Sequence, residues 1–452
     1  MRIRMKQCAM AVAAIALGEG ACSLDLQNPN APTEGQVTTT VPGVIALATG
    51  LQNRFSQSYG NYAYMAGLVT DEFASTTAAL VSISDAEQGA VPPNTGIADN
   101  VFNSVYRTVR TANDLLAGSN ALATQFDAGT LSGIRALSYA LKAEALGEAL
   151  QSYQSIPIDI SSTAPPYVGR SVALPYVRAL LDSAANELAA QAPSTFFNSN
   201  ILTPGVNLSN VIQLLRARYA RMANDDATAI AASNLVARSG TAALSALTFV
   251  NPTINFYNNV TGGTNGIAPR RQWRTSMTGG DQRFNYFVTP SATLTGRVGA
   301  LLDPWIRYTS PTAPMPIYMP DEALLIKAEA LNRQGNSAQA IAVLDSVRTD
   351  CPGGRGIDDP KACLAAYGGA VTQVAIEADI YLQRRYELLS TGLRWEDSRR
   401  RGFIRGPVAT PGVPADGQRC WLPYAVGDRN ANPNVPADPS EPSTFPAACP
   451  TT

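Results

Sequence analysis

Two stretches of the chain repeat the same pattern of small and large apolar residues, and this repeat restricts the possible folds more than any other feature. Residues 214–236 (LLRARYARMANDDATAIAASNLV) and 324–352 (LLIKAEALNRQGNSAQAIAVLDSVRTDCP) can be overlaid at a fixed offset. The matched positions are Ala217, Ala220, Ala229 and Ile230 in the first stretch and Ala328, Leu331, Ala340 and Ile341 in the second. Small residues at such spacing let two antiparallel helices approach closely. The repeat therefore predicts tetratricopeptide-like helical hairpins.

Another helical hairpin is predicted before these repeats. Residues 130–150 place Ile134, Leu137 and Leu141 at helical spacing, and residues 174–191 (LPYVRALLDSAANELAAQ) show a similar amphipathic pattern. We expect the two helices to pair with each other. The fold class predicted from all these segments is mainly α, a tetratricopeptide-like superhelix with long loop-rich insertions and short strands.

The predicted organisation is a single domain over residues 22–452, because no long linker divides the chain. Within it, we place helical repeats at roughly 100–240 and 318–402. A loop region at roughly 241–317 separates them, and a loop-rich tail covers 403–452.

The loop region contains most of the candidate ligand-binding residues. Loops on a rigid scaffold often carry binding residues, and Trp273, Tyr286 and Trp305 all lie in this region. Tyr62 belongs to a second aromatic cluster near the N-terminus. Aromatic faces that are exposed to solvent can stack on the apolar faces of sugars. We therefore expect these four rings to contact a ligand, although the alternative is that they pack in the core.

The N-terminus has the composition of an export signal. Residues 2–6 contain three basic side chains, and the apolar run that follows is too short to span a bilayer. We predict a signal peptide over residues 1–21 and a lipid anchor on Cys22. Glu19 stands where a leucine usually precedes such a cysteine. Ordinary secretion, with Cys22 left as a free thiol, is the alternative.

Four further cysteines lie in the C-terminal part of the chain and allow three disulfide connectivities. Pairing Cys351 with Cys363 and Cys420 with Cys449 needs the least chain closure, so we predict these two disulfides. A zinc site is the alternative, but the chain has neither a CxxC spacing nor a histidine.

The absence of histidine excludes Ser-His-Asp triads, Cys-His pairs and histidine-bound metal centres. Catalysis by two carboxylates alone is compatible with the composition, but the local sequence marks no pair of acids as special. Charged residues make up only 15% of the chain and the net charge is −1. A nucleic-acid partner is therefore not expected, because no basic face accumulates. We predict no catalytic residue, metal or cofactor.

Residues 383–402 (QRRYELLSTGLRWEDSRRRG) combine charges, aromatic rings and a helix-breaking glycine in one short segment. Arg384 and Glu387 lie three residues apart, as do Arg394 and Asp397. Such spacings bring opposite charges together on a helix. The segment therefore predicts two short helices, each with a local ion pair, on either side of the glycine.

The same segment resembles the ELxxEGxRWxDxxRxG signature of the SusD/RagB family of outer-membrane nutrient-binding lipoproteins. The matching residues are Glu387, Leu388, Gly392, Arg394, Trp395, Asp397, Arg400 and Gly402. Gln383 and Thr391 replace glutamates that are usual in the family. Residues 421–434 (WLPYAVGDRNANPN) are similar to the closing PIPxxExxxNP segment of that family, and the resemblance extends over nearly the whole chain.

The resemblance implies a lipoprotein of the outer membrane that is exposed at the cell surface. Such a protein would capture an oligosaccharide, or a peptide, and deliver it to a TonB-dependent (SusC-like) transporter barrel. It would not be an enzyme. Two alternatives are a carboxylate-based glycoside hydrolase and a tetratricopeptide lipoprotein that acts only as an envelope scaffold.

Overall fold

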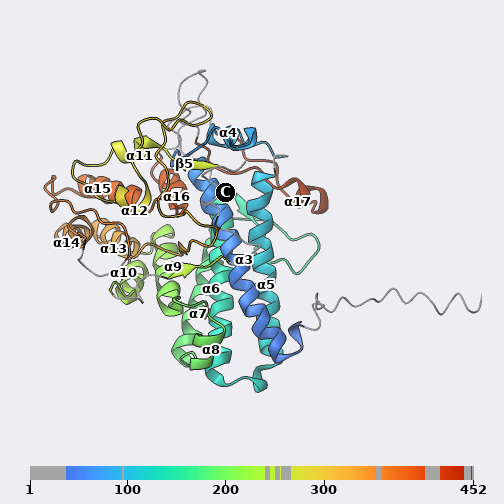
Figure 1. The fold of residues 1–452 in the computed structure, drawn as a ribbon. Coiled ribbons are helices and arrows are strands. Elements are labelled where there is room, and N and C mark those ends of the chain that lie inside the picture. The colour runs from blue at the N-terminus through green and yellow to red at the C-terminus, as the bar shows by residue number, and fades with distance from the viewer. Residues whose placement is uncertain are drawn as a thin grey trace, which may run out of the picture.

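The computed structural model describes residues 37–93, 96–239, 245–249, 255, 266–352, 358–402, 418–441 and 449 (Figure 1). The predicted signal peptide, Cys22 and parts of the predicted loop region lie outside these residues. The described part is mainly helical with a few short strands, which confirms the predicted fold class. None of its helices has both the length and the apolar character needed to cross a membrane.

Four long helices lie side by side and extend to the bottom of the molecule as drawn (Figure 1). They are α3 (Val41–Leu68), α5 (Ile97–Ala121), α6 (Ala128–Ser152) and α7 (Arg170–Ala190). The central helix is α6, which contacts the other three and is buried along most of its length. Its start is fixed by Asp127, whose carboxylate accepts a hydrogen bond of 2.8 Å from the backbone N–H of Thr130.

The predicted repeats form consecutive helical hairpins beside this group. The first overlaid stretch forms α9 (Leu208–Met222) and α10 (Asp226–Leu235), and the second forms α13 (Glu322–Arg333) and α14 (Ser337–Arg348). Helix α7 contacts α9, and α10 contacts α13, so the hairpins stack into a superhelix. The contact between the α9–α10 hairpin and the α13–α14 hairpin uses small side chains. Its buried apolar residues are Ala217, Ala220, Ala229, Ala232, Ile326 and Ala330.

The signature segment forms the last hairpin of the superhelix. It consists of α15 (Gln373–Glu387) and α16 (Leu393–Arg400). Helix α15 contacts α13 and α14, whereas α16 reaches across to α3. Figure 1 shows α16 near the centre of the molecule, between the stacked hairpins and the long helices. The segment therefore joins the two parts of the fold.

Within the residues that the structure describes, three two-stranded antiparallel sheets attach the loops to the helices. Their strands pair as β1 (Phe73–Ser75) with β5 (Ile267–Pro269), β2 (Ser155–Ile156) with β3 (Val168–Gly169), and β4 (Ala246–Leu247) with β6 (Met315–Pro316). Strands of two or three residues cannot form a layer of their own. They act as local links, and β1–β5 joins the end of α3 to the loop region.

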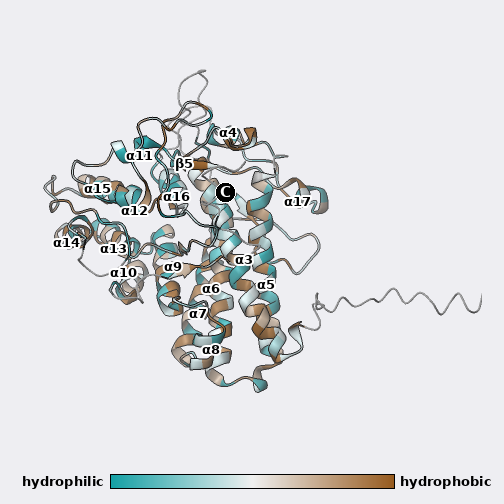
Figure 2. Ribbon diagram, viewed as in Figure 1, coloured by the Kyte–Doolittle hydropathy of each residue, from teal (hydrophilic) through white to brown (hydrophobic). Residues whose placement is uncertain are grey.

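The remaining short elements lie at the ends of the long helices and in the loops. They are α4 (Val81–Glu87), η1 (Ala123–Gln125), α8 (Thr195–Asn200), α11 (Arg271–Thr275), α12 (Phe284–Phe287) and α17 (Val426–Ala431). Hydrophobic and hydrophilic residues are mixed along the long helices (Figure 2). One large apolar cluster runs from the long helices into the loop region.

Candidate functional site

Three of the four aromatic residues predicted to contact a ligand are buried in the core. Tyr62, Trp273 and Trp305 are 1%, 2% and 4% exposed, respectively. The expectation that they present a ring face to solvent is therefore wrong. The physical reason is that each polar atom finds an internal partner, which lets the apolar ring be buried without cost. The indole Nε1 of Trp273 donates to the carbonyl of Arg385, and that of Trp305 donates to the carbonyl of Ile267.

Tyr62 packs against the glycine that precedes α16. Its hydroxyl lies 2.9 Å from Gln151 Oε1 and 3.1 Å from the carbonyl oxygen of Gly392. Gly392 has a φ of 79°, and a Cβ at this position would lie 2.6 Å from the Tyr62 ring. Only glycine meets both conditions. The glycine of the signature is therefore required where α16 begins against α3.

Tyr286 is the remaining predicted aromatic, and it is half-buried. The guanidinium of Arg307 lies 3.9 Å from its ring centroid, and its hydroxyl donates to the carbonyl of Asp358. Burial raises the pKa of the Tyr286 hydroxyl well above its usual range, although Arg307 opposes the shift. Part of the ring is exposed, but Arg307 already covers one face.

Both pairs of cysteines in the C-terminal part form disulfides. Cys351 is bonded to Cys363, and Cys420 is bonded to Cys449. This is the pairing that needs the least chain closure. The second disulfide links two points of the tail. The tail contacts α16 through the carbonyl of Cys420, which accepts a hydrogen bond of 2.8 Å from Arg399.

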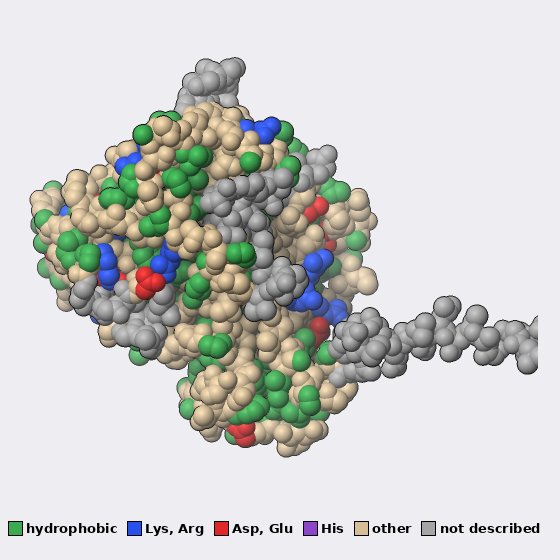
Figure 3. Space-filling model, viewed as in Figure 1, with side chains coloured by type: hydrophobic (Ala, Val, Ile, Leu, Met, Phe, Trp, Pro, Cys, Tyr) green, Lys and Arg blue, Asp and Glu red, His purple; other side chains and the backbone are tan. Residues whose placement is uncertain are grey.

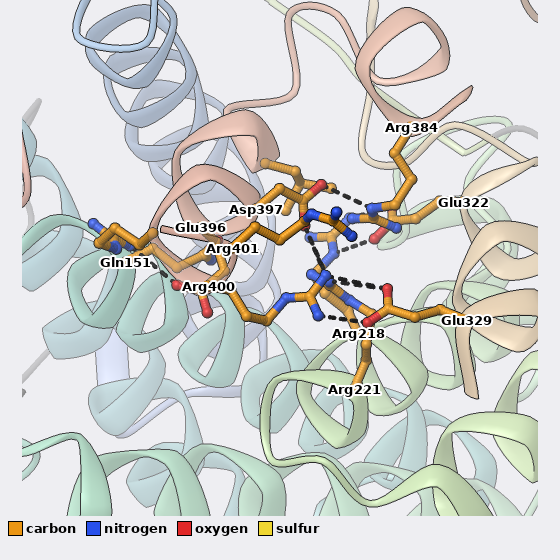
Figure 4. Close-up of polar contacts among 12 residues, drawn as sticks. Gln151, Arg218, Arg221, Glu322, Glu329, Arg384, Glu396, Asp397, Arg400 and Arg401 are labelled. Atoms are coloured by element: carbon orange, nitrogen blue, oxygen red, sulfur yellow. Dashed lines mark hydrogen bonds and ion pairs between the residues drawn. The ribbon is translucent and has the colours of Figure 1, made fainter. Parts of the chain in front are cut away.

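The signature residues participate in a buried network of ion pairs (Figure 4). Asp397 of α16 accepts hydrogen bonds from Arg384 Nε at 2.7 Å and from Arg221 Nη1 at 3.0 Å. Glu329 of α13 accepts from Arg400 at 2.5 Å and from Arg221 at 3.5 Å. The network therefore joins α9, α13, α15 and α16 through side chains that lie far apart in the sequence.

The arrangement of charges differs from the local pairs predicted from helical spacing. Arg384 pairs with Asp397 of the next helix instead of Glu387, and Arg394 stacks over the ring of Tyr381 at 5.0 Å from its centroid. The difference arises because the faces of α15 and α16 that carry these charges are buried against other helices. The neighbouring helices therefore decide which partner each charge meets, and in α16 Arg399 still pairs with Glu396 at i, i+3.

The protonation states in this network follow from its charges. Burial alone would raise the pKa of Asp397, but Arg384, Arg221 and Arg400 outweigh it and hold the pKa well below its usual range. Burial likewise favours a higher pKa for Glu329, and Arg221 and Arg400 again reverse the direction. Both side chains are therefore ionised at neutral pH.

A second ion-pair group lies deeper, against α6. Arg218 donates to Glu144 at 2.6 Å and to both oxygens of Glu322 at 2.7 and 2.8 Å, and Tyr219 donates to Glu144 at 2.7 Å. These charges are inside the protein, whereas the face drawn in Figure 3 shows few acidic or basic side chains. Much of the sparse charge of this chain is thus used in internal contacts.

A cavity of about 170 Å³ borders the signature network. It is bounded by the start of α7, the end of α9, helix α16 and the tail. Its charged lining residues are Arg170, Glu396, Arg399 and Arg400, and its other lining residues are Met222, Asn224, Trp421 and Cys449. It is the candidate binding site that the described residues support best.

The charged side chains of this cavity are held firmly in place. Arg170 forms a bidentate pair with Glu396, with contacts of 2.5 and 3.0 Å, and Arg399 donates to the same carboxylate at 3.1 Å. The guanidinium of Arg399 lies between two rings, 4.1 Å from the centroid of Trp421 and 4.9 Å from that of Trp395. Burial would raise the pKa of Glu396, but the two arginines lower it to about 2.

Sequence reasoning did not single out this cavity. Arg170, Met222 and Trp421 come from three separate parts of the chain, and no local pattern marks any of them as a ligand contact. The available signal was the resemblance itself, since Arg399 and the signature residue Arg400 lie within residues 383–402 and Trp421 opens residues 421–434.

One group of carboxylates in the described part of the chain has a spacing that could suit a metal ion. Single oxygens of Asp321, Asp359 and Glu387 all lie within 4.8 Å of one another. Lys361 forms an ion pair with Asp359, and Arg283 lies 3.7 Å from Glu387. Since these cations already offset negative charge in the group, it is not by itself a metal site.

In the described part of the chain, fold and site together define a helical-repeat protein with an internal ion-pair network and an arginine-rich cavity. Searches against family models and against curated proteins give no match. Solved structures do match. A SusD superfamily protein from Bacteroides vulgatus aligns with a TM-score of 0.67 at 17% identity, covering 90% of this chain and 100% of that chain.

Two further solved structures agree. NanU of B. fragilis aligns with a TM-score of 0.64 at 14% identity, covering 91% of this chain and 99% of that chain. A SusD-like carbohydrate-binding protein from Bacteroides vulgatus aligns with a TM-score of 0.65 at 14% identity, covering 88% of this chain and 97% of that chain. The chain therefore has the SusD-like fold over about nine-tenths of its length.

Proposed function

We propose that this chain is a cell-envelope protein that binds a carbohydrate and does not alter it. The SusD-like fold supports the proposal, because one neighbour with this fold is described as carbohydrate-binding. Its main support in the chain itself is the cavity between α7, α9, α16 and the tail. This cavity combines fixed hydrogen-bonding groups with the apolar side chains of Met222 and Trp421, as small-molecule sites generally do.

The lining of the cavity favours binding over hydrolysis. A glycoside hydrolase needs two carboxyl groups on either side of the scissile bond, and one of them must have a raised pKa. Glu396 is the single carboxylate among the lining residues. Its pKa is lowered to about 2 by Arg170 and Arg399, against the effect of burial. A carboxylate that is held ionised cannot act as the general acid.

Binding is tested by screening the purified protein against a glycan array and measuring the hits by isothermal titration calorimetry. Each hit is then incubated with the protein, and the products are analysed by chromatography. We expect binding without new reducing ends. Cleavage of a hit that disappears in a Glu396→Gln variant would establish the hydrolase instead.

We further propose that the protein is anchored to the outer membrane through a lipid on Cys22 and delivers its ligand to a TonB-dependent transporter. A Cys22→Ser variant should move from the membrane fraction to the soluble fraction and lose labelling by a fatty-acid analogue. Continued sedimentation and labelling would contradict the anchor. Affinity purification of the anchored protein should recover a transporter barrel, whereas recovery of envelope assembly factors alone would favour the scaffold.

A further inference from the structure

The ion pairs that border the cavity have an excess of positive charge. Arg170 and Arg399 share one carboxylate, that of Glu396. The adjoining group contains three guanidiniums, those of Arg221, Arg384 and Arg400, and two carboxylates, those of Glu329 and Asp397. Together these two groups contain five arginines and three acids, which leaves two positive charges in excess. The deeper group of Arg218, Glu144 and Glu322 offsets one of them. Charges taken out of water are costly unless they are balanced.

The hydrogen-bond donors of this group are also in excess. Within the described part of the chain, the buried Nε atoms of Arg399 and Arg400 have no acceptor, although both side chains line the cavity. Deeper in the group, two nitrogens of Arg221 and two of Arg384 also lack acceptors there. A buried donor without an acceptor costs free energy. Both the charge and the donors therefore call for an anionic acceptor in the cavity.

The cavity can be reached from solvent and has the size of a small organic group. The side chains of Arg170 and Arg400 remain 21% and 18% exposed, so guanidiniums lie at its rim. Its volume of about 170 Å³ is several times the roughly 30 Å³ that one water occupies in the liquid. It is smaller than the roughly 300–1,000 Å³ of sites that enclose drug-sized ligands. One sugar unit suits this volume better than a whole oligosaccharide does.

We propose that the cavity binds a carboxylate-bearing sugar unit, such as a uronic acid at the end of a glycan. The carboxylate would pair with the guanidiniums of Arg399 and Arg400, since arginine matches the two oxygens of a carboxylate. The apolar face of the sugar would lie against Met222 and Trp421. This inference rests on the proposed carbohydrate binding and narrows it to acidic glycans.

The first test compares acidic sugars with neutral sugars of the same ring configuration. The anchored full-length protein in detergent is titrated calorimetrically with glucuronate, galacturonate, glucose, galactose and acetate. We expect binding of at least one uronate, no detectable binding of its neutral counterpart, and weaker binding of acetate. Binding should weaken as salt is raised, because partly exposed charges are screened.

The alternative results separate recognition of the carboxylate, recognition of the sugar ring and carbohydrate binding as a whole. Equal binding of a uronate and its neutral counterpart would show that the arginines do not recognise the carboxylate. Acetate binding as tight as the uronate would restrict the cavity to a simple anion site. If neutral glycans from the array bind and no uronate does, the acidic-sugar inference fails while the proposed function stands. If no glycan of any kind binds, the proposed function fails as well.

The second test introduces a negative charge at the cavity wall without disturbing the fold. Asn224 has a φ of 58° and accepts a hydrogen bond from Arg333. Aspartate tolerates this backbone conformation and keeps the acceptor. Asn224→Asp should therefore leave the melting temperature unchanged and weaken uronate binding at least about tenfold, because like charges brought together at a binding site are strongly unfavourable.

Two matched variants separate charge from shape. Asn224→Gly removes the same side chain without adding charge, so it should lose less affinity for uronate than Asn224→Asp does. Asn234→Asp adds the same charge to a residue that does not line the cavity and also accepts from a cation, Lys327. It should bind normally. Unchanged binding by Asn224→Asp, or equal losses in Asn224→Asp and Asn234→Asp, would place the ligand outside this cavity.

Discussion

Trp273 packs edge-on against Phe287 and Tyr386, with ring centroids 5.7 and 6.2 Å apart. Because the ring is enclosed, we expect Trp273→Ala to lower the free energy of unfolding by roughly 3–5 kcal/mol. Guanidinium chloride unfolding followed by circular dichroism measures the change. A variant that keeps wild-type stability but loses glycan binding would restore the role that the sequence suggested for this residue.

Glu72 provides a second prediction for a single residue, and this one depends on pH. The carboxyl is 4% exposed, and burial raises its pKa to about 8 from an ordinary value of 4.5, although Arg394 and Arg385 act in the opposite direction. The folded state therefore keeps the proton that the unfolded state releases above pH 4.5. The stability that this proton contributes is fully present below pH 4.5 and is lost as the pH rises towards 8.

A Glu72→Gln variant should remove this loss, because glutamine remains neutral at every pH. At pH 8, the variant should be more stable than wild type by at least about 1.4 kcal/mol, the value of one pKa unit. At pH 4.5, the two proteins should have similar stability. Urea unfolding at both pH values measures the difference. A variant that is destabilised equally at both would show that Glu72 is ionised in the folded protein.

At the scale of elements, the Tyr219 side chain of α9 packs tightly against α6 at Gly147. A Cβ on Gly147 would lie 1.6 Å from the hydroxyl of Tyr219, which in turn donates to Glu144. We expect Gly147→Ala to destabilise the protein by roughly 1–3 kcal/mol, as overpacking does. Gly50 of α3 is the matched control, since a Cβ there would meet no atom within 4 Å.

Gly50→Ala should stabilise the protein by roughly 0.5–1 kcal/mol, because alanine favours a helix more than glycine does. Thermal unfolding of both variants should therefore show shifts of opposite sign. Equal shifts in the same direction would contradict the close contact of Tyr219 with Gly147.

The helices also show which structural features sequence patterns can predict and which they cannot. Apolar spacing predicted the hairpins α9–α10 and α13–α14, because a buried helical face must repeat with the helical period. The predicted ion pair of Arg394 with Asp397 was wrong. Spacing places two charges on one face, but only the neighbouring helices decide whether that face meets water or other side chains.

At the scale of the whole molecule, one disulfide closes a loop between α14 and α15, and the other links two points of the tail after α16. Their sequence separations are 12 and 29 residues. Replacing both cysteines of either pair by serine should lower the free energy of unfolding by roughly 3 kcal/mol. The loss should be slightly larger for Cys420–Cys449, by less than about 1 kcal/mol, since loop-closure entropy grows slowly with loop length. Chemical unfolding of both double variants checks the values. A negligible loss from either pair would contradict the crosslink.

The sequence by itself determined the helical repeats, the cysteine pairing and the resemblance of residues 383–402 to a known signature. These features depend on periodicity and on short stretches of chain. Only the tertiary structure decided that Trp273 and Trp305 are buried and that the arginine-rich cavity exists. Exposure depends on which segments cover a residue, and the cavity joins Arg170 to Trp421 across some 250 intervening residues. Contacts between such distant segments leave no local pattern, because packing and long-range charge, not spacing along the chain, create them.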